Sequence, residues 1–187
     1  MRMVRSALIV VSIAIYALAS AAGVSERATR SSDFSIPSHG SLRLAVPTGW
    51  QTDSLPLARP ASVTIHFTPT QGGAFDVTIT SVWMDANALA KATVEARKRE
   101  MQQSADEMLP RSVEKTATLQ EIKGVESVGC YYSLTDREPG EGEFKYVIQG
   151  TVLTGDVLSA FTILSRAPAA AEATQALRML AEANYVK

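Results

Sequence analysis

The sequence contains few residues of the types that bind metals or attack substrates. It has two histidines, His39 and His66, and one cysteine, Cys130. A zinc site ordinarily needs three or four His, Cys or acidic ligands, and these three residues lie far apart in the sequence. His66 alternates with the apolar Ile65 and Phe67, so it points to the opposite face of a predicted strand, where an exposed or cross-strand polar role is expected. We therefore predict no metal site and no cofactor.

Cys130 lies in a strand-like run, 128–132, where it shares one face with Val128, Tyr132 and Leu134. As the only cysteine, it cannot form an intramolecular disulfide. An odd cysteine in an exported protein is sometimes reactive or paired with another chain. A free cysteine among apolar neighbours usually behaves as a small buried hydrophobic residue, so we predict a core position.

Four carboxylates gather around a Pro-Gly pair, at Asp136, Glu138, Glu141 and Glu143. Carboxylate oxygens are suitable calcium ligands, but the cluster lacks the D-x-D-x-D-G spacing of an EF-hand loop. Arg137, in the middle of the cluster, would repel a cation. The sequence therefore predicts a charged hairpin tip here.

Motifs for catalysis are missing from the sequence. It has no G-x-S-x-G elbow, no P-loop and no G-x-G-x-x-G after a strand. A Ser-His-Asp triad would have to use His66, and no local motif marks a serine. Paired carboxylates can be assembled from 19 acidic residues in any fold. We predict that the protein is not an enzyme and has no catalytic residues, with a hydrolase of non-local site as the alternative.

Aromatic residues are candidates to line a ligand groove. They are Trp50, Trp83, Tyr131, Tyr132 and Tyr146. All of them lie in or beside predicted strands, where aromatic side chains normally fill core or cross-strand positions. We predict core packing for both tryptophans and leave the ligand- or partner-binding residues unassigned.

The N-terminal segment has the pattern of an export signal. Arg2 and Arg5 precede an apolar run from Ala7 to Ala19, and small residues follow at 19–22. This order matches a secretory signal peptide over residues 1–21. We expect a periplasmic or secreted protein.

Two processing sites fit the small residues. Cleavage after Ala21 would leave a mature chain starting near Ala22, and cleavage after Ala19 is the competing possibility. The alternative to cleavage is an uncleaved envelope anchor, although a spanning helix needs about 20 apolar residues and this run is shorter.

Composition limits the classes of partner. The mature chain would have 166 residues, 16 basic and 19 acidic, with a formal charge of −3. That length suits one domain, and the mean hydropathy of the full 187-residue chain is +0.04. Nucleic-acid binders usually show clustered Lys and Arg, so we exclude nucleic acid. We expect a protein partner in the cell envelope or an unidentified small ligand, and no stable membrane insertion after cleavage.

Hydrophobic periodicity predicts the first part of the domain. Residues 22–40 are polar and predict a flexible leader, and 41–187 predict one folded domain. Apolar residues alternate from Leu42 to Val46, as in a half-buried strand. Residues 51–60, with two prolines, predict a connecting loop. Alternating runs at 63–67 and 77–83, joined across a Gly-Gly turn region, predict an antiparallel hairpin.

A change to good helix formers predicts a long helix over Asn87–Leu109, capped by Asp85 or Asn87 and stopped by Pro110. The basic run 97–99 is predicted on its solvated face, since acidic residues surround it. Five apolar residues near helical spacing are predicted to face the sheet: Ala90, Val94, Met101, Ala105 and Met108.

The second half predicts a meander and a closing helix. Four strand-like segments have glycine-marked turns between them: Val113–Ile122, Val125–Thr135, Glu143–Thr154 and Asp156–Arg166. The last has two apolar faces and should lie mid-sheet, covered on both sides. A helix is predicted from Pro168 to about Asn184. The fold class is therefore α+β, a mostly antiparallel sheet (hairpin plus four-stranded meander) flanked by a long central helix and a C-terminal helix.

The segment 42–50, which ends in Pro47-x-Gly49-Trp50, resembles the opening of PsbP-like domains. The order hairpin, helix, meander, terminal helix is also similar to that superfamily, over about Ser41 to Val186. The resemblance implies an antiparallel sheet flanked by helices and non-catalytic roles as extrinsic subunits, adaptors and envelope proteins. It transfers no catalytic residue and no metal site.

Three functions remain open. The first is an exported, non-enzymatic accessory or binding module of the cell envelope. The second is a carrier of a small apolar or lipid-like ligand, which an apolar pocket of roughly 300 Å³ or more would favour. The third is the hydrolase. A broad exposed apolar patch without a pocket would favour the first.

Overall fold

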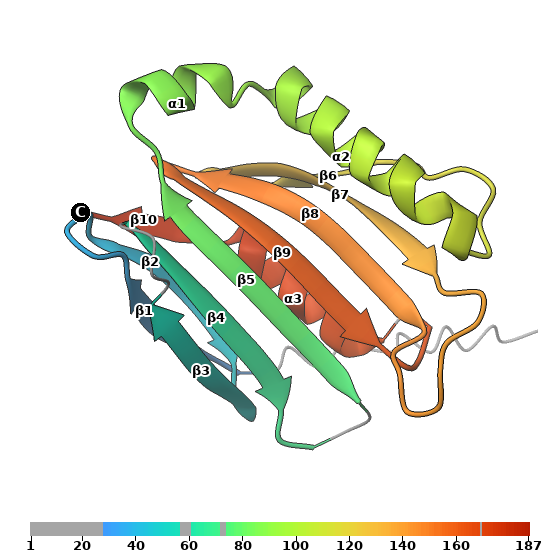
Figure 1. Ribbon diagram of the computed structural model, residues 1–187. Coiled ribbons are helices and arrows are strands. Elements are labelled where there is room, and N and C mark those ends of the chain that lie inside the picture. The colour runs from blue at the N-terminus through green and yellow to red at the C-terminus, as the bar shows by residue number, and fades with distance from the viewer. Residues whose placement is uncertain (1–27, 57–60, 72–73, 169) are drawn as a thin grey trace, which may run out of the picture.

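The computed structural model describes residues 28–56, 61–71, 74–168 and 170–187 (Figure 1). Over these residues it has ten strands, three α-helices and one short 3₁₀ helix. In chain order they are β1 (Thr29–Ser35), β2 (Ser41–Pro47), β3 (Trp50–Pro56), β4 (Ser62–Pro69), β5 (Phe75–Trp83), α1 (Ala86–Lys91), α2 (Val94–Met108), η1 (Leu109–Arg111), β6 (Gln120–Lys123), β7 (Ser127–Thr135), β8 (Tyr146–Thr154), β9 (Val157–Ser165), α3 (Ala171–Ala181) and β10 (Asn184–Val186).

Two antiparallel sheets make up the fold. The larger has seven strands in the order β3-β4-β5-β9-β8-β7-β6, and the smaller has the order β1-β2-β10. The predicted hairpin is β4–β5, and the predicted meander is β6 to β9. Strand β9 pairs with β5 on one side and β8 on the other, as predicted for a mid-sheet strand. The α+β class predicted from the sequence is confirmed.

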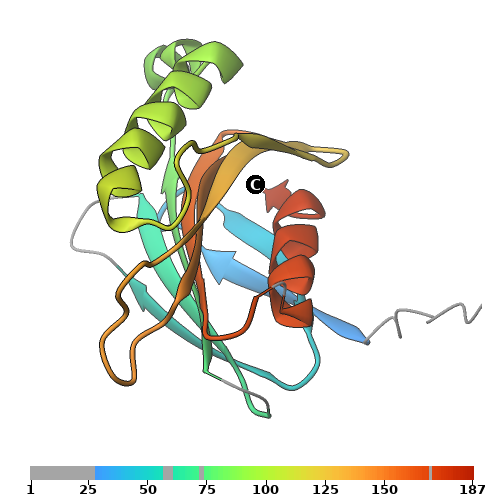
Figure 2. The same ribbon diagram turned by 90° about the vertical axis from the view of Figure 1, so that its right-hand side faces the viewer.

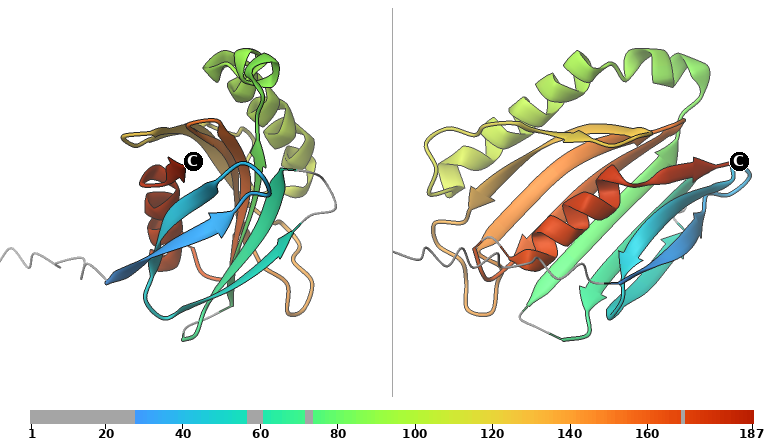
Figure 3. Two further views of the ribbon diagram at one scale, coloured as in Figure 1. Left: turned by 90° about the vertical axis from the view of Figure 1, so that its left-hand side faces the viewer. Right: turned by 180° about the vertical axis from the view of Figure 1, so that it is seen from behind.

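The helices lie on opposite faces of the seven-stranded sheet. Helix α3 and the smaller sheet lie together against one face, here called the inner face (Figures 2 and 3). Helices α1 and α2 lie on the other, outer face, with α2 above β7 and β8. The outer faces of β3 and β4 lie away from α2 (Figure 2).

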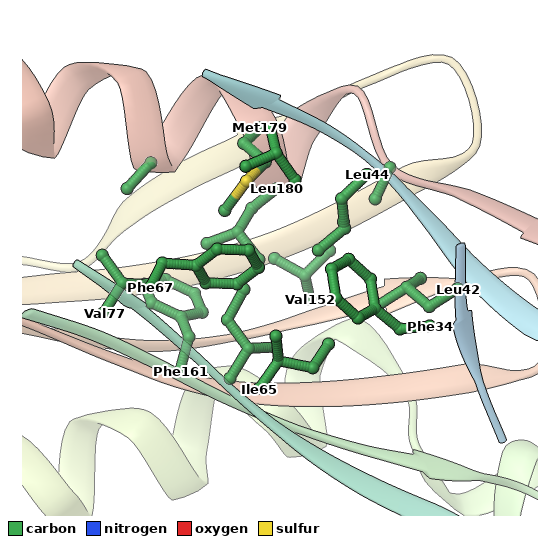
Figure 4. Close-up of a cluster of buried hydrophobic side chains, with 14 of the residues drawn as sticks. Phe34, Leu42, Leu44, Ile65, Phe67, Val77, Val152, Phe161, Met179 and Leu180 are labelled. Atoms are coloured by element: carbon green, nitrogen blue, oxygen red, sulfur yellow. The ribbon is translucent and has the colours of Figure 1, made fainter. Parts of the chain in front are cut away.

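The core lies between the inner face, the smaller sheet and α3 (Figure 4). Ile65 and Phe67 of β4 point toward Leu42 of β2 and Leu180 of α3, and all four are at most 1% exposed. Burial of each such side chain contributes about 1.5–3 kcal/mol to the free energy of unfolding. Period-two alternation of buried residues along β2, β4 and β5 builds this core, as the sequence predicted.

The prediction of a flexible leader over 22–40 was wrong for its second half. Thr29–Ser35 pairs along its whole length with β2. Phe34 and Ile36 are buried, whereas the other residues of the segment are polar or exposed. One alternating face with two apolar anchors is enough for a strand at the edge of a small sheet. The proposed signal peptide, 1–21, lies outside the described residues.

The loop predicted over 51–60 was wrong as far as residue 56, because Trp50–Pro56 forms the edge strand β3. Edge strands tolerate polar residues and a terminal proline, since one side of the backbone faces solvent. Residues 57–60 lie outside the described residues.

The predicted long helix is two helices. Asp85 caps α1 by accepting from the Ala88 N–H, as predicted, and Thr93 caps α2 by accepting from the Ala96 N–H. Of the five residues predicted to face the sheet, only Ala105 is buried, and Val94 is exposed. Helix α1 ends at its C-cap, Ala92, and α1 has no buried residue.

Three further boundaries differ from prediction. The strand expected over Val113–Ile122 shortens to β6, and the terminal helix starts at Ala171 rather than Pro168. Residues 184–186, expected in part at the helix end, form β10 on the smaller sheet. The outer face of β9 is less covered than predicted, because Ala160 is exposed.

Candidate functional site

The residues examined for chemistry do not converge on one site. The His39 ring stacks on Trp83 with 3.8 Å between centroids, so its placement in a mobile leader was wrong. His66 lies on the outer face of β4, with Nδ1 3.2 Å from the Thr78 hydroxyl, which is the predicted cross-strand polar role. Cys130 lies on β7 and is 2% exposed, as predicted for a core residue.

The thiol of Cys130 is not poised to react. Burial raises its pKa, and the nearby guanidinium of Arg97 only partly offsets this effect. Since the thiolate is the nucleophile, a buried thiol with a raised pKa is inert.

The four carboxylates near Gly140 belong to a charged hairpin, as the sequence predicted. Asp136 accepts from the Glu138 N–H at 3.0 Å, and Glu143 accepts from the Gly140 N–H at 2.9 Å. Within the described ranges, no group of three or more His, Cys, Asp or Glu side chains is arranged to hold a metal ion.

The candidate site is a cleft between α2 and the outer face of the sheet, here called the α2 cleft. It consists of two adjoining depressions of about 230 and 330 Å³. Gln149 and Thr162 line both. The smaller depression is also lined by Thr78, Thr80, Met101, Thr151 and Ala160. The larger is also lined by Met108, Arg111, Leu134, Lys145, Val147 and Leu164.

Packing at one edge of the sheet positions α2. Ala105, which is fully buried, packs with Tyr132 and Leu134 of β7. The Tyr132 hydroxyl lies 3.0 Å from the Ser104 hydroxyl and donates to Gln149 at 2.5 Å. These contacts fix α2 over β7 and β8.

Small side chains create the space beside α2. Thr78 and Thr80 of β5 and Ala160 and Thr162 of β9 follow one another across the sheet in register. They are too short to fill the volume in front of the helix. Met101, from α2, reaches the same depression. Methionine is flexible and polarizable, so this wall suits a ligand of irregular shape.

Polarity changes along the cleft. The smaller depression presents hydroxyls and the Gln149 amide, whereas the larger has an apolar floor of Leu134, Val147 and Leu164. The site can therefore hold a molecule with both an apolar and a polar part.

A second cavity, of about 360 Å³, lies between the start of α3 and the ends of β7, β8 and β9. Its one carboxylate, Glu114, accepts from the Thr135 N–H at 2.8 Å and from the Thr135 hydroxyl at 2.7 Å. Burial raises the pKa of Glu114, but these hydrogen bonds outweigh burial and hold it below its usual 4.5. Both oxygens of the Glu114 carboxylate are therefore held by Thr135.

Sequence reasoning did not identify the α2 cleft. Met101 and Met108 were expected to face the sheet, and both are half-buried and line the cleft. The aromatic candidates fill other places: Trp50 and Tyr132 are buried, and Trp83 packs against the core. The signal that was available is the run of Thr and Ala on the outer face of adjacent strands.

Comparison with known proteins supports the fold. No family model matches the sequence, and no curated protein matches it. Three solved chains match in structure. A PsbP-like fold is shown by one of them. It is the solution structure of cyanobacterial PsbP (CyanoP) from Synechocystis sp. PCC 6803. Its TM-score is 0.51 at 13% sequence identity, and the match covers 90% of this chain and 99% of that chain.

The resemblance read from Pro47-x-Gly49-Trp50 is thus confirmed at the level of fold. The part of the chain that the structure describes contains no helix with the length and apolar character needed to cross a membrane.

Proposed function

We propose that the protein is an exported, non-enzymatic binding module of the cell envelope that carries a small amphipathic ligand in the α2 cleft. The observation that carries the proposal is the larger depression, which has about 330 Å³ of space over an apolar floor with charged residues at its rim. Small-molecule sites have this size and this mixture of apolar walls and few polar groups. Export is inferred from the signal pattern of residues 1–21.

Exposed apolar side chains favour a small ligand over a protein-docking face. Among the described residues the exposed large ones come from four parts of the chain and include no aromatic residue. They are Leu55, Val94, Val113, Val125 and Val128. The centres of protein–protein interfaces are instead rich in Trp, Tyr and Arg.

Accessory binding of an envelope protein is the second candidate. The PsbP-like fold favours it, because the resemblance stated above implies extrinsic-subunit and adaptor roles. This role is compatible with the first, since a carrier delivers its ligand to a partner.

Hydrolysis is less well supported by the geometry. The Thr78 hydroxyl contacts His66 at 3.2 Å and donates to Asp76 at 3.3 Å, so a hydroxyl, an imidazole and a carboxylate do meet. Thr78 lies in the middle of β5, which pairs with β4 and β9. The backbone N–H groups around Thr78 are hydrogen-bonded to the neighbouring strands. Stabilising an oxyanion instead needs N–H donors that are free and point at it. Turnover of p-nitrophenyl esters that His66→Ala abolishes would contradict a non-enzymatic role.

Methionine methyl NMR tests the binding site. The six methionines of the chain include Met101 and Met108 in the cleft and Met179, which is 1% exposed in the core. With ¹³C-methyl methionine and eight-carbon probes (octanoate, 1-octanol and octylammonium), we expect shifts at Met101 and Met108 and none at Met179.

Blocking variants complete the test. Thr162→Trp places a large ring where the two depressions meet and should abolish the shifts. Thr68→Trp is the matched control, because Thr68 is exposed on the outer face of β4 and lines neither depression. If no probe moves Met101 or Met108, or if Thr162→Trp leaves binding unchanged, the α2 cleft is not the binding site.

A further inference from the structure

We propose that the ligand of the α2 cleft is an anionic amphiphile, with its apolar body on the floor of the larger depression and its anionic head at the end of the sheet next to Lys145. The inference rests on the proposed function and specifies the ligand class. It follows from the order of residues along the outer face.

The register places an apolar row across three strands. Leu164 of β9 pairs with Val147 of β8, which pairs with Leu134 of β7. All three line the larger depression, together with Met108 from α2 and Phe144. A hydrocarbon chain or ring lying over this row is covered by Met108. On β5 the row ends at Asp76, whose carboxylate accepts from Thr78, so the apolar body is confined to β7, β8 and β9.

A charged row follows at the ends of the same strands. Lys145 and Asp136 are neighbours, because the Asp136 N–H donates to the Lys145 carbonyl at 2.7 Å. Arg166 follows directly after β9, and its guanidinium donates to the Gly142 carbonyl, outside the lining of either depression. Arg111, from η1, lies 3.9 Å from Asp136.

The cations that line the larger depression outnumber its carboxylates. They are Arg111 and Lys145, and the one carboxylate is Asp136. One oxygen of Asp136 accepts from the Glu138 N–H, and the other faces Arg111. Lys145 has no ion pair with any described residue, and its ammonium lies 5.9 Å from the centre of the Tyr146 ring. An anionic head over the apolar row would meet this free ammonium first.

Three probes with the same eight-carbon body separate the contributions of head and body. Octanoate, 1-octanol and octylammonium are titrated into the protein at low ionic strength, because salt screens exposed charges. We expect Kd for octanoate to be at least about tenfold lower than for octylammonium, with 1-octanol between them.

Charge reversal at one residue tests the role of Lys145. Lys145→Glu should raise Kd for octanoate about tenfold, lower it for octylammonium and leave 1-octanol unchanged. Lys115→Glu makes the same change of charge at an exposed lysine that lines neither depression, and should alter none of the three by more than about twofold.

The outcomes separate the two proposals. If 1-octanol or octylammonium binds in the cleft as tightly as octanoate, or if Lys145→Glu changes nothing, the anionic assignment is wrong while the binding module stands. If no probe shifts Met101 or Met108, both proposals fall. Binding of octanoate that Lys115→Glu weakens as much as Lys145→Glu would show a general charge effect and overturn the assignment.

Discussion

Arg97 is the residue whose environment differs most from its sequence context. It lies between Ala96 and Lys98 on a polar helix, yet it is only 3% exposed. Its Nη1 donates to the Val128 carbonyl at 2.9 Å and its Nε to the Ala92 carbonyl at 3.3 Å. A single side chain therefore joins the end of α1, the start of α2 and β7, and it fixes α2 above the cleft.

Replacing Arg97 tests this role. Arg97→Ala removes both hydrogen bonds and leaves the Val128 region less covered, so we expect a loss of about 2 kcal/mol in the free energy of unfolding. Urea denaturation of the two proteins measures it. Arg99→Ala, two residues away and exposed, should change stability by less than about 0.5 kcal/mol. Equal effects of the two substitutions would show that Arg97 is a surface residue.

The position of Arg97 was not predictable from its neighbours. Surrounding acidic residues made the run 97–99 look solvated, and for Arg99 this prediction was right. The acceptors of Arg97 are backbone carbonyls, one of them 31 residues away. Every residue has a backbone carbonyl, so the sequence does not show which one accepts a hydrogen bond.

Among the elements, β1 shows how a polar segment joins a core. Its ladder with β2 runs from Thr29 to Ser35, and Asp33 accepts from Arg43 of β2 at 2.7 Å. The Arg43 guanidinium holds the pKa of Asp33 below its usual value. Phe34 contacts Phe67 edge-to-face with 5.7 Å between the ring centres. The strand is therefore held by a complete ladder, the Asp33–Arg43 ion pair and one aromatic contact.

Truncation of Phe34 tests whether β1 is part of the folded domain. Phe34→Ala should lower the free energy of unfolding by about 3 kcal/mol, because it leaves a cavity beside Phe67. Ser31→Ala, at an exposed position of the same strand, is the control and should have almost no effect. A flexible leader would give the same stability for both variants, in thermal and in urea unfolding.

Strong periodicity explains which elements the sequence predicted well. Strands β2, β4, β5 and β9 bury every second residue, and their alternation is visible in the sequence. Helix α2 buries only Arg97 and Ala105, so its sheet-facing side could not be identified from apolar spacing. The short strands β6 and β10 depend on their partners, since three or four residues carry too little pattern.

At the scale of the whole molecule, the candidate site could not be predicted from the sequence for a related reason. The α2 cleft combines β5, β7, β8, β9, α2 and η1, which are distant in the chain. Only the register of the meander brings Leu164, Val147 and Leu134 into one row. A sequence identifies such residues as strand positions but does not show that a helix lies above them with space in between.

Export of the whole molecule is testable through the processing of its N-terminus. If the signal is cleaved, the mature protein should be found in the periplasmic or secreted fraction, with an N-terminus at Ala22 or, for the competing site, at Ser20.

Ala19 belongs to both cleavage sites, because it is the first small residue of the 19–21 site and the last of the 17–19 site. Ala19→Phe should therefore block processing and leave the precursor with the membranes, whereas Ser20→Phe should be processed normally at the 19–21 site, whose middle position is unrestricted. Only residues 22–28 separate that site from β1, so an unprocessed domain would be held within about 25 Å of the membrane. N-terminal sequencing and mass spectrometry of fractionated cells measure both outcomes, and a wild-type chain that keeps Met1 in the membrane fraction would establish the uncleaved anchor in place of a freely diffusing carrier.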